Sequence, residues 1–222
     1  MAVTFIQSVD QTEAKDYLVS VIGGRLDSGT DVLWLLSGGS NIRLAVEVAK
    51  GLVGIDLDDL TVMLADERFG TVGHPDSNWQ QLMDAGFELP GATMVPTLMG
   101  LGLDESTRDY TVYLGDQLAS DAYKVGLFGI GSDGHTAGIL PGSPAVGCAD
   151  MVAGYTARDH TRITMTARAI ARLDEAVVTA FGPSKRVQLE RLRTDLSEIQ
   201  QPAQVLKAVP LRIFSDFKEN SL

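Results

Sequence analysis

The sequence predicts an α/β fold in which helices cover both faces of a mostly parallel, Rossmann-like sheet and so form three layers, α/β/α. Short apolar runs alternate along the chain with segments whose apolar residues recur at helical spacing. Several of these runs are apolar at almost every position, which is typical of strands that helices bury on both faces. Neither a linker nor an internal repeat interrupts the 222 residues, so we expect a single domain over residues 1–222.

These patterns locate the elements in chain order. Apolar runs predict strands at residues 32–36, 61–65, 125–130, 162–166, 176–181 and 211–214. Helical spacing of apolar residues predicts helices at residues 12–26, 42–51, 77–85, 104–119 and 184–193. Ser77 is expected to cap the third helix, and Gly182-Pro183 marks the start of the last one. We expect residues 88–102 to be rich in loops.

The charge balance limits the partners of the protein. The formal net charge is −11, and a field of that sign repels nucleic acid and anionic membrane surfaces. The same field opposes a phosphorylated substrate, so a phosphate site requires local positive groups. The single cysteine, Cys148, excludes an intrachain disulfide, and no apolar stretch approaches the roughly 18–20 residues of a membrane span. We therefore expect a soluble, cytoplasmic protein.

The strongest sign of chemistry is a glycine-rich segment after the expected strand at residues 125–130. It reads Gly129-Ile130-Gly131-Ser132-Asp133-Gly134-His135-Thr136-Ala137. Ligands of open α/β sheets bind at the carboxyl ends of strands, and histidine titrates nearer to neutrality than other side chains. His135 is therefore a candidate acid–base group, with Asp133 beside it. A structural histidine is the alternative, but the glycine-rich turn favours function.

A second turn, Ser37-Gly38-Gly39-Ser40, joins the strand at residues 32–36 to the next helix. Its glycines let backbone N–H groups approach an anion, and the helix N-terminus and serine hydroxyls add further favourable interactions. A tight turn with a helix cap is an equally good interpretation of this turn on its own. The spacing matches neither the phosphate-loop nor the dinucleotide fingerprint, so no nucleotide cofactor is indicated.

Charged residues follow a third expected strand end, at Asp66-Glu67-Arg68. Arginine can hold a phosphate through two parallel hydrogen bonds, and an aspartate can orient a substrate hydroxyl or a histidine. A surface ion-pair cluster is the alternative. Further along, Asp76-Ser77-Asn78 is either a helix cap or a source of polar groups for the same crevice.

Two more basic residues, Arg162 and Lys185, stand at the ends of expected elements, where a cation can reach an anionic ligand. From position alone, a solvated charge is the better interpretation of each. The sequence lacks ligand spacing typical of a metal site, and Ser40 lacks the closing glycine of a Gly-x-Ser-x-Gly elbow. We therefore expect neither a metal nor a serine nucleophile.

Together, these motifs resemble the 6-phosphogluconolactonase family in order and in spacing. The resemblance covers residues 32–144 and continues more weakly through residues 162–166 and 181–185. Glucosamine-6-phosphate deaminases of the same superfamily follow Asp-Gly-His with Ile-Ala-Phe-Asn-Glu-Pro and usually carry an aromatic residue where Arg68 stands. This chain has Thr136-Ala-Gly-Ile-Leu-Pro141 instead, which favours the lactonase branch.

The chain departs from the lactonase pattern at three places. It has Asn41-Ile42, Gly70-Thr71 and Gly138-Ile139 where lactonases often have Thr-Pro, Val-Pro and Ser-Leu. These departures bear on the exact substrate and leave the charged groups in place.

The resemblance implies hydrolysis of 6-phospho-D-glucono-1,5-lactone to 6-phospho-D-gluconate, in the oxidative pentose phosphate pathway, without metal or organic cofactor. It implies that His135 activates water, that Asp66 or Asp133 orients the imidazole or the sugar hydroxyls, and that N–H groups of the glycine turn face the oxyanion. The substrate is expected to contact Ser37, Gly38, Gly39, Ser40, Arg68, Asn78, Gly131, Arg162 and Lys185. We expect a monomer or weak homodimer. The alternatives are a glucosamine-6-phosphate deaminase or isomerase and a non-catalytic sugar-phosphate-binding module.

Overall fold

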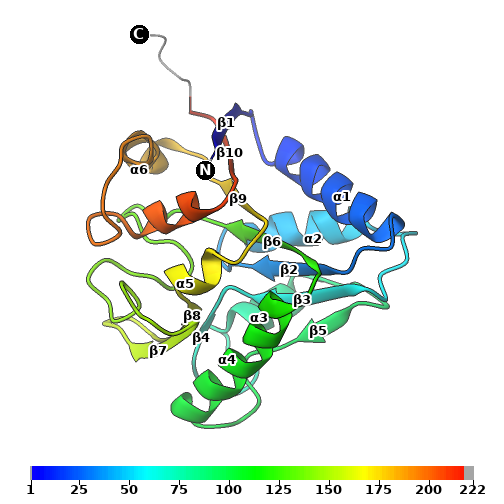
Figure 1. Cartoon of the computed structure of the whole chain (residues 1–222), viewed down its shortest axis with the longest axis horizontal. Coiled ribbons are helices and arrows are strands. Elements are labelled where there is room, and N and C mark those ends of the chain that lie inside the picture. Colours follow the sequence, from blue (N-terminus) through cyan, green and yellow to red (C-terminus); the bar gives the residue numbers. More distant parts are fainter. Residues whose placement is uncertain (1, 218–222) are drawn as a thin grey trace.

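The main sheet of the computed structural model, which describes residues 2–217, contains seven strands. They are β1 (Val3–Gln7), β2 (Val32–Leu36), β3 (Leu60–Leu64), β5 (Thr93–Val95), β6 (Tyr123–Phe128), β9 (Glu175–Thr179) and β10 (Leu211–Ser215). All neighbouring pairs are parallel, in the order β1-β10-β9-β6-β2-β3-β5. The first and last strands therefore lie side by side (Figure 1). Met1 and residues 218–222, which the predicted domain includes, lie outside the described residues.

Helices connect these strands and lie on both faces of the sheet (Figure 1). They are α1 (Thr12–Asp27), α2 (Asn41–Gly51), α3 (Asn78–Asp84), α4 (Leu103–Ala119), α5 (Ala167–Ile170) and α6 (Arg186–Leu192), with 3-10 turns η1 (Pro183–Lys185) and η2 (Pro202–Ala208). Within residues 2–217, none of the helices has both the length and the apolar character needed to cross a membrane.

Strand β2 shows how the sheet separates two hydrophobic cores. Its side chains alternate between the faces, and all five of its residues are buried. Leu33 and Leu35 join the core covered by α4, α5, α6 and η2, whereas Trp34 and Leu36 join the core covered by α1 and α2. The predicted three-layer α/β/α fold with a mostly parallel sheet is confirmed.

A second, antiparallel sheet contains β4 (Asp66–Arg68), β8 (Thr161–Met165) and β7 (Val152–Thr156), in that order. The strand predicted at residues 162–166 exists as β8, but it joins this small sheet instead of the parallel one. The chain passes from β3 through Ala65 directly into β4, where Asp66 pairs with Thr164 and Arg68 with Arg162. The antiparallel sheet therefore begins where a central parallel strand ends.

The order of the parallel strands creates a reversal beside β2. The chain places β3 and then β5 on one side of β2, and afterwards crosses to the other side to place β6, β9 and β10. In open α/β sheets, the carboxyl ends of strands flanking such a reversal border a crevice that binds ligands. The turns after β2 and β6, at residues 37–40 and 129–137, are therefore brought together by topology.

Candidate active site

A pocket of about 470 Å³ lies at the carboxyl ends of β2 and β6, where the strand order reverses. Its walls come from the turns after these strands, from β4, from the first residue of α3 and from the segment after β9. The predicted site residues that line it are Ser37, Gly38, Gly39, Ser40, Asp66, Arg68, Asn78, Gly131, His135 and Lys185. Asp133 and Arg162 are not among the residues that line the pocket.

The imidazole of His135 enters the pocket with one nitrogen already bound. Its Nδ1 lies 2.6 Å from Oδ1 of Asp133, and the same oxygen accepts the backbone N–H of His135 at 3.1 Å. Partial burial opposes ionisation of Asp133, but these hydrogen bonds and the charge of His135 lower the pKa of its carboxyl. Because a carboxylate only accepts hydrogen bonds, Nδ1 carries a proton, and in the neutral ring Nε2 then presents its lone pair. Of the two candidate carboxylates, Asp133 is the one that contacts the ring.

The turn that holds this pair requires a glycine at position 131. A Cβ there would lie 2.1 Å from His135 Nδ1 and 2.6 Å from Asp133 Oδ1. The Gly131 N–H donates to the His135 carbonyl at 2.8 Å, so it is engaged within the turn. Ser132 also lines the pocket, and its N–H has no acceptor within residues 2–217. Ser132 is therefore the better-placed donor for a developing oxyanion in this turn.

Three side chains at the pocket carry buried polar atoms that have no partner in the described part of the chain. These atoms are Ser37 Oγ, Arg68 Nε and Asn78 Oδ1. Buried polar groups in proteins are almost always hydrogen-bonded, so each exception calls for an explanation such as a ligand or a water. A hydroxyl, a guanidinium nitrogen and an amide oxygen gathered in one pocket suit a phosphorylated sugar.

The turn at residues 37–40 also presents polar groups without partners, in this case backbone N–H groups. The backbone N–H groups of Gly38, Gly39 and Ser40 donate to no acceptor among residues 2–217. Ser40 stands at the N-cap position of α2 without forming a capping hydrogen bond, whereas Ser77 at α3 accepts the Gln80 N–H at 3.0 Å. Open N–H groups at a helix N-terminus favour anion binding over a simple helix cap for this turn.

Asp66 is buried at the pocket, between charges of the opposite sign. Burial raises the pKa of its carboxyl, while the charges of Arg68, His135 and Arg162 act to lower it. Asn78 donates from Nδ2 to the Asp66 backbone oxygen at 2.9 Å and to Oδ2 at 3.4 Å. Asp66 is thus placed to orient substrate hydroxyls, with its own position fixed by Asn78.

Glu67, between the two site residues of β4, points away from the pocket and holds the start of α3. Its carboxylate accepts the Ser77 hydroxyl at 2.9 Å and the N–H groups of Asn78 and Trp79 at 2.7 and 3.1 Å. The Arg68 N–H donates to the same carboxylate at 2.6 Å. Burial raises the pKa of Glu67 against these hydrogen bonds. The carboxylate thereby joins α3, which carries Asn78, to β4, which carries Arg68.

The two additional basic residues differ in their placement. Lys185 lines the pocket, and its Nζ donates to the Ile130 carbonyl at 2.6 Å. Arg162 is buried, and its Nη1 and Nη2 contact the two carboxylate oxygens of Asp159 at 2.9 and 2.8 Å. This hydrogen-bonded pair lowers the pKa of Asp159. Arg162 therefore influences the site through its charge near Asp66, while Lys185 is within reach of a ligand.

Sequence reasoning missed three side chains that line the pocket, namely Gln11, Thr179 and Phe181. Gln11 donates from Nε2 to Thr179 Oγ1 at 3.4 Å, and Thr179 donates to Asn41 Oδ1 at 2.7 Å. Thr179 ends β9 and Phe181 ends the strand predicted at residues 176–181, so the carboxyl end of that strand was a usable signal for both. Gln11 follows β1, a strand that the apolar pattern did not predict, and its sequence carried no comparable signal.

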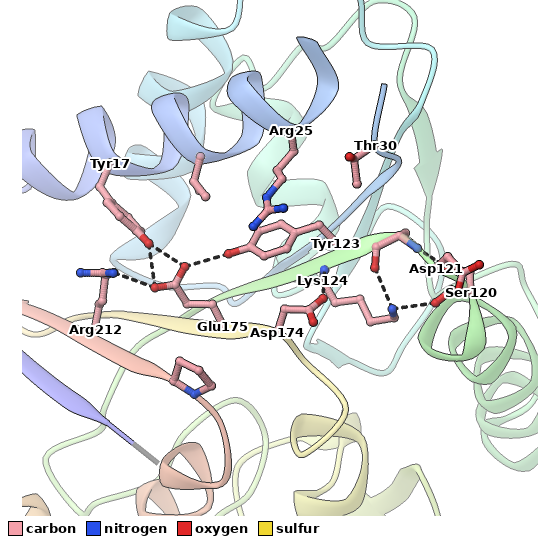
Figure 2. Close-up of a pocket in the computed structure, with 13 residues that line it drawn as sticks. Tyr17, Arg25, Thr30, Ser120, Asp121, Tyr123, Lys124, Asp174, Glu175 and Arg212 are labelled. Carbon is pink, nitrogen blue, oxygen red and sulfur yellow. Dashed lines mark hydrogen bonds and ion pairs between the residues drawn. The ribbon is translucent and has the colours of Figure 1, made fainter. Parts of the chain in front are cut away.

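A larger hollow of about 740 Å³ lies at the opposite edge of the sheet, where Tyr123 and Glu175 begin β6 and β9. Figure 2 shows side chains there that point toward one another. The Glu175 carboxylate accepts the hydroxyls of Tyr17 and Tyr123 at 2.6 and 2.9 Å and Nε of Arg212 at 2.7 Å. None of the unpartnered buried atoms in residues 2–217 lies in this hollow. The smaller pocket is therefore the better candidate site.

The described part of the chain contains no group of three or more His, Cys, Asp or Glu side chains placed to hold a metal ion.

Known proteins provide an independent comparison. A model of the family described as glucosamine-6-phosphate isomerases/6-phosphogluconolactonase matches residues 9–213. The chain is 28% identical to a 6-phosphogluconolactonase of Synechocystis over 186 residues, which cover 78% of this chain and 76% of the relative. It is 29% identical to a 6-phosphogluconolactonase of Pseudomonas putida over 194 residues, which cover 81% and 77%. The solved structure of a 6-phosphogluconolactonase from Shewanella baltica shares the fold, with a TM-score of 0.80, 19% identity and 97% of each chain covered. The chain therefore belongs to the glucosamine-6-phosphate isomerase/6-phosphogluconolactonase family.

Proposed function

We propose that this protein hydrolyses 6-phospho-D-glucono-1,5-lactone to 6-phospho-D-gluconate and is a carboxylic ester hydrolase of the oxidative pentose phosphate pathway. One observation carries the proposal: a histidine held by a carboxylate at 2.6 Å shares a pocket with an arginine nitrogen that has no partner among the described residues. An acid–base group and a phosphate-binding group are what a phosphorylated cyclic ester requires. The names of the relatives from Synechocystis and Pseudomonas putida support the same substrate.

The proposed reaction depends on the protonation state of the His135 imidazole. Nε2 of neutral His135 takes a proton from water while the water oxygen bonds to the lactone carbonyl carbon. The carbonyl oxygen becomes an oxyanion near the Ser132 N–H. Collapse of this intermediate breaks the bond from the carbonyl carbon to the ring oxygen, which receives the proton from Nε2. Asp133 stabilises the transient imidazolium, and the acid product loses its proton to solvent.

Substrate binding is assigned to local positive groups, because the net charge of −11 opposes a phosphorylated ligand. We place the phosphate among Arg68, Lys185 and the open N–H groups of residues 38–40. This arrangement puts binding and proton transfer on different loops of one pocket. General acid–base catalysis contributes typically about 10²–10⁴-fold, which suffices for a lactone that also opens without help.

A coupled assay tests the proposal. A dehydrogenase generates the phosphorylated lactone in place from glucose 6-phosphate, the spontaneous rate is subtracted, and the unphosphorylated lactone serves as the control substrate. We expect the protein to accelerate hydrolysis of the phosphorylated lactone and to act poorly on the control. No acceleration overturns the proposal. Ammonia release from glucosamine 6-phosphate would favour a deaminase, and tight binding of 6-phosphogluconate without hydrolysis would favour a binding module.

Three expectations remain predictions about the same protein. They are a cytoplasmic location, a monomer or weak homodimer, and a single domain over residues 1–222. Light scattering during size-exclusion chromatography measures the oligomeric state. A single cooperative unfolding transition would support one domain.

A further inference from the structure

We propose that three buried glutamines, Gln188, Gln201 and Gln204, form a hydrogen-bonded ladder that positions the turn carrying His135. The inference rests on the proposed role of His135 as the acid–base group. Gln188 belongs to α6, Gln204 belongs to η2, and Gln201 directly precedes η2. None of these residues lines the pocket, so they act on the reaction only through the turn.

The turn is tied to the C-terminal part of the chain at three carbonyl groups. The carbonyl oxygens of Ile130, Ser132 and Gly134 accept hydrogen bonds from Lys185 Nζ at 2.6 Å, Gln188 Nε2 at 2.9 Å and the Ala203 N–H at 2.9 Å. These carbonyls alternate along the segment that ends at His135. Each is held by a different donor, so the backbone of the turn is fixed at several points before the imidazole.

The ladder continues behind Gln188. Gln201 donates from Nε2 to the backbone oxygen of Gln188 at 2.8 Å and to its Oε1 at 3.2 Å. Gln204 donates from Nε2 to Gln201 Oε1 at 2.8 Å. The Gln188 and Gln201 amides therefore donate toward the turn and accept from behind, and Gln204 donates at the far end, which gives the ladder a direction. The three residues are 5%, 0% and 9% exposed, so water does not readily replace these bonds.

The glutamines also pack against the backbone next to the histidine. Gly134 directly precedes His135 and adopts φ +88°, and a Cβ there would lie 2.9 Å from Gln188 Oε1 and 3.0 Å from Gln201 Cγ. The turn thus packs against the glutamines of the ladder in addition to forming hydrogen bonds with them. A shift of Gln188 would therefore move the backbone that carries the imidazole.

Neutral amides suit this task. A glutamate at position 188 would place an acceptor against the Ser132 carbonyl, and it would add a negative charge behind the Asp133–His135 pair. A glutamine holds the carbonyl without altering the charge of the site. Since Arg68 binds the substrate from β4, the ladder controls how the imidazole meets a substrate that is held independently. Gln188 is in this sense a positioning residue.

The test compares Gln188→Met, which keeps the size and loses the donor, with Gln200→Met. Gln200 is exposed and bonds locally to Ser197, so its variant makes the same chemical change outside the ladder. We expect Gln188→Met to lower kcat by roughly 10- to 100-fold with little change in KM, since a misplacement of about 1 Å can cost about 100-fold. Gln200→Met should retain the kcat of the unaltered protein. Gln188→Glu should lose kcat as well, because the donor to Ser132 is again absent.

A second readout separates positioning from stability and from the proposed function. The ¹⁵N resonances of the His135 imidazole and amide hydrogen exchange at Gly134 and His135 are compared across the same variants. We expect both to change in Gln188→Met and to stay constant in Gln200→Met, whether or not the lactone is the substrate. The proposal would be overturned if Gln188→Met left the His135 resonances and the amide exchange unchanged, or if it left kcat unchanged in an active protein. If Gln188→Met does not fold, Gln201→Met replaces it, with the same measurements and the same expected changes.

Discussion

His135 and Asp133 divide the acid–base chemistry between the side chain that carries the proton and the side chain that holds the ring. His135→Ala removes the proton carrier, so kcat should fall by about 10²–10⁴-fold. The imidazole is 38% exposed and, among residues 2–217, bonds only within its own turn, so the melting temperature should change little. The coupled assay and a melting curve check both expectations. A variant with near-normal kcat would show that another group moves the proton.

Arg68 should govern binding more than chemistry. Its Nε is buried without a partner in the described residues, and the side chain lines the pocket on β4. Arg68→Ala should raise KM roughly 10- to 100-fold, because hydrogen bonds to charged groups contribute about 1.5–3 kcal/mol. Arg68→Lys should restore only part of the loss, since an ammonium cannot form the paired bonds of a guanidinium.

Substrate-dependence curves for the two Arg68 variants separate KM from kcat. Unphosphorylated lactone is the control, because its hydrolysis should change little in either variant. An equal loss on both lactones would place Arg68 at the carbonyl end of the substrate instead of the phosphate.

Most of the predicted residues that line the pocket lie in turns that follow strands of the parallel sheet. Residues 37–40 and His135 could be predicted because a parallel sheet gathers the carboxyl ends of its strands at one edge. Arg162 was harder to place, since its position depends on the antiparallel pairing of β4 with β8. Gln188 had no local signal, because its role depends on contacts with residues 132, 201 and 204 that only the fold creates.

At the scale of elements, burial decided which strands could be predicted. Strands β2, β6 and β9 are almost wholly buried, and their apolar runs located them within two residues. Strand β4 is three charged residues, and nothing in that composition predicts a strand. Its conformation comes from pairing with β8. Strands β1 and β5 were missed because both are partly exposed and at the edges of the sheet, and β5 has only three residues.

Glu67 makes the junction between β4 and α3 testable. Glu67→Gln keeps the shape but turns an amide donor toward groups that already donate, namely Ser77 Oγ and the N–H groups of Asn78 and Trp79. A buried donor left unsatisfied costs about 1–3 kcal/mol, so the free energy of unfolding should fall by that amount. Chemical denaturation measures it. Glu88→Gln, on an exposed residue, is the matched control and should leave stability unchanged.

The junction should also affect binding. Asn78 and Arg68 both depend on Glu67 for their backbone positions. A loosened junction should therefore raise KM in the fraction that remains folded. Wild-type stability in Glu67→Gln would mean that the carboxylate is not required to hold the start of α3.

On the scale of the whole molecule, the pocket and the larger hollow are two polar centres that lie at opposite ends of the parallel strands. The pocket at the carboxyl edge has buried polar atoms that lack partners in the described part of the chain, as a binding site requires. The hollow at the amino edge contains a closed network, in which Glu175 of β9 bonds to Tyr17 of α1, Tyr123 of β6 and Arg212 of β10 (Figure 2). Four elements meet at one carboxylate there, so we assign stability to this edge and chemistry to the other.

This assignment predicts how stability changes in alkali. Burial, followed by the hydrogen bond and the charge of Glu175, raises the pKa of Tyr17 from 10.0 to about 12. A phenol whose pKa is higher in the folded state stabilises the fold fully below its unfolded pKa, and the contribution is lost as pH rises through the folded value. The free energy of unfolding should therefore decline between pH 10 and pH 12. Tyr17→Phe should make that decline shallower, while Tyr113→Phe, on an exposed tyrosine, should leave it unchanged. Denaturation at several pH values measures the slopes, and identical slopes for Tyr17→Phe and the unaltered protein would remove Tyr17 from the network that stabilises the amino edge.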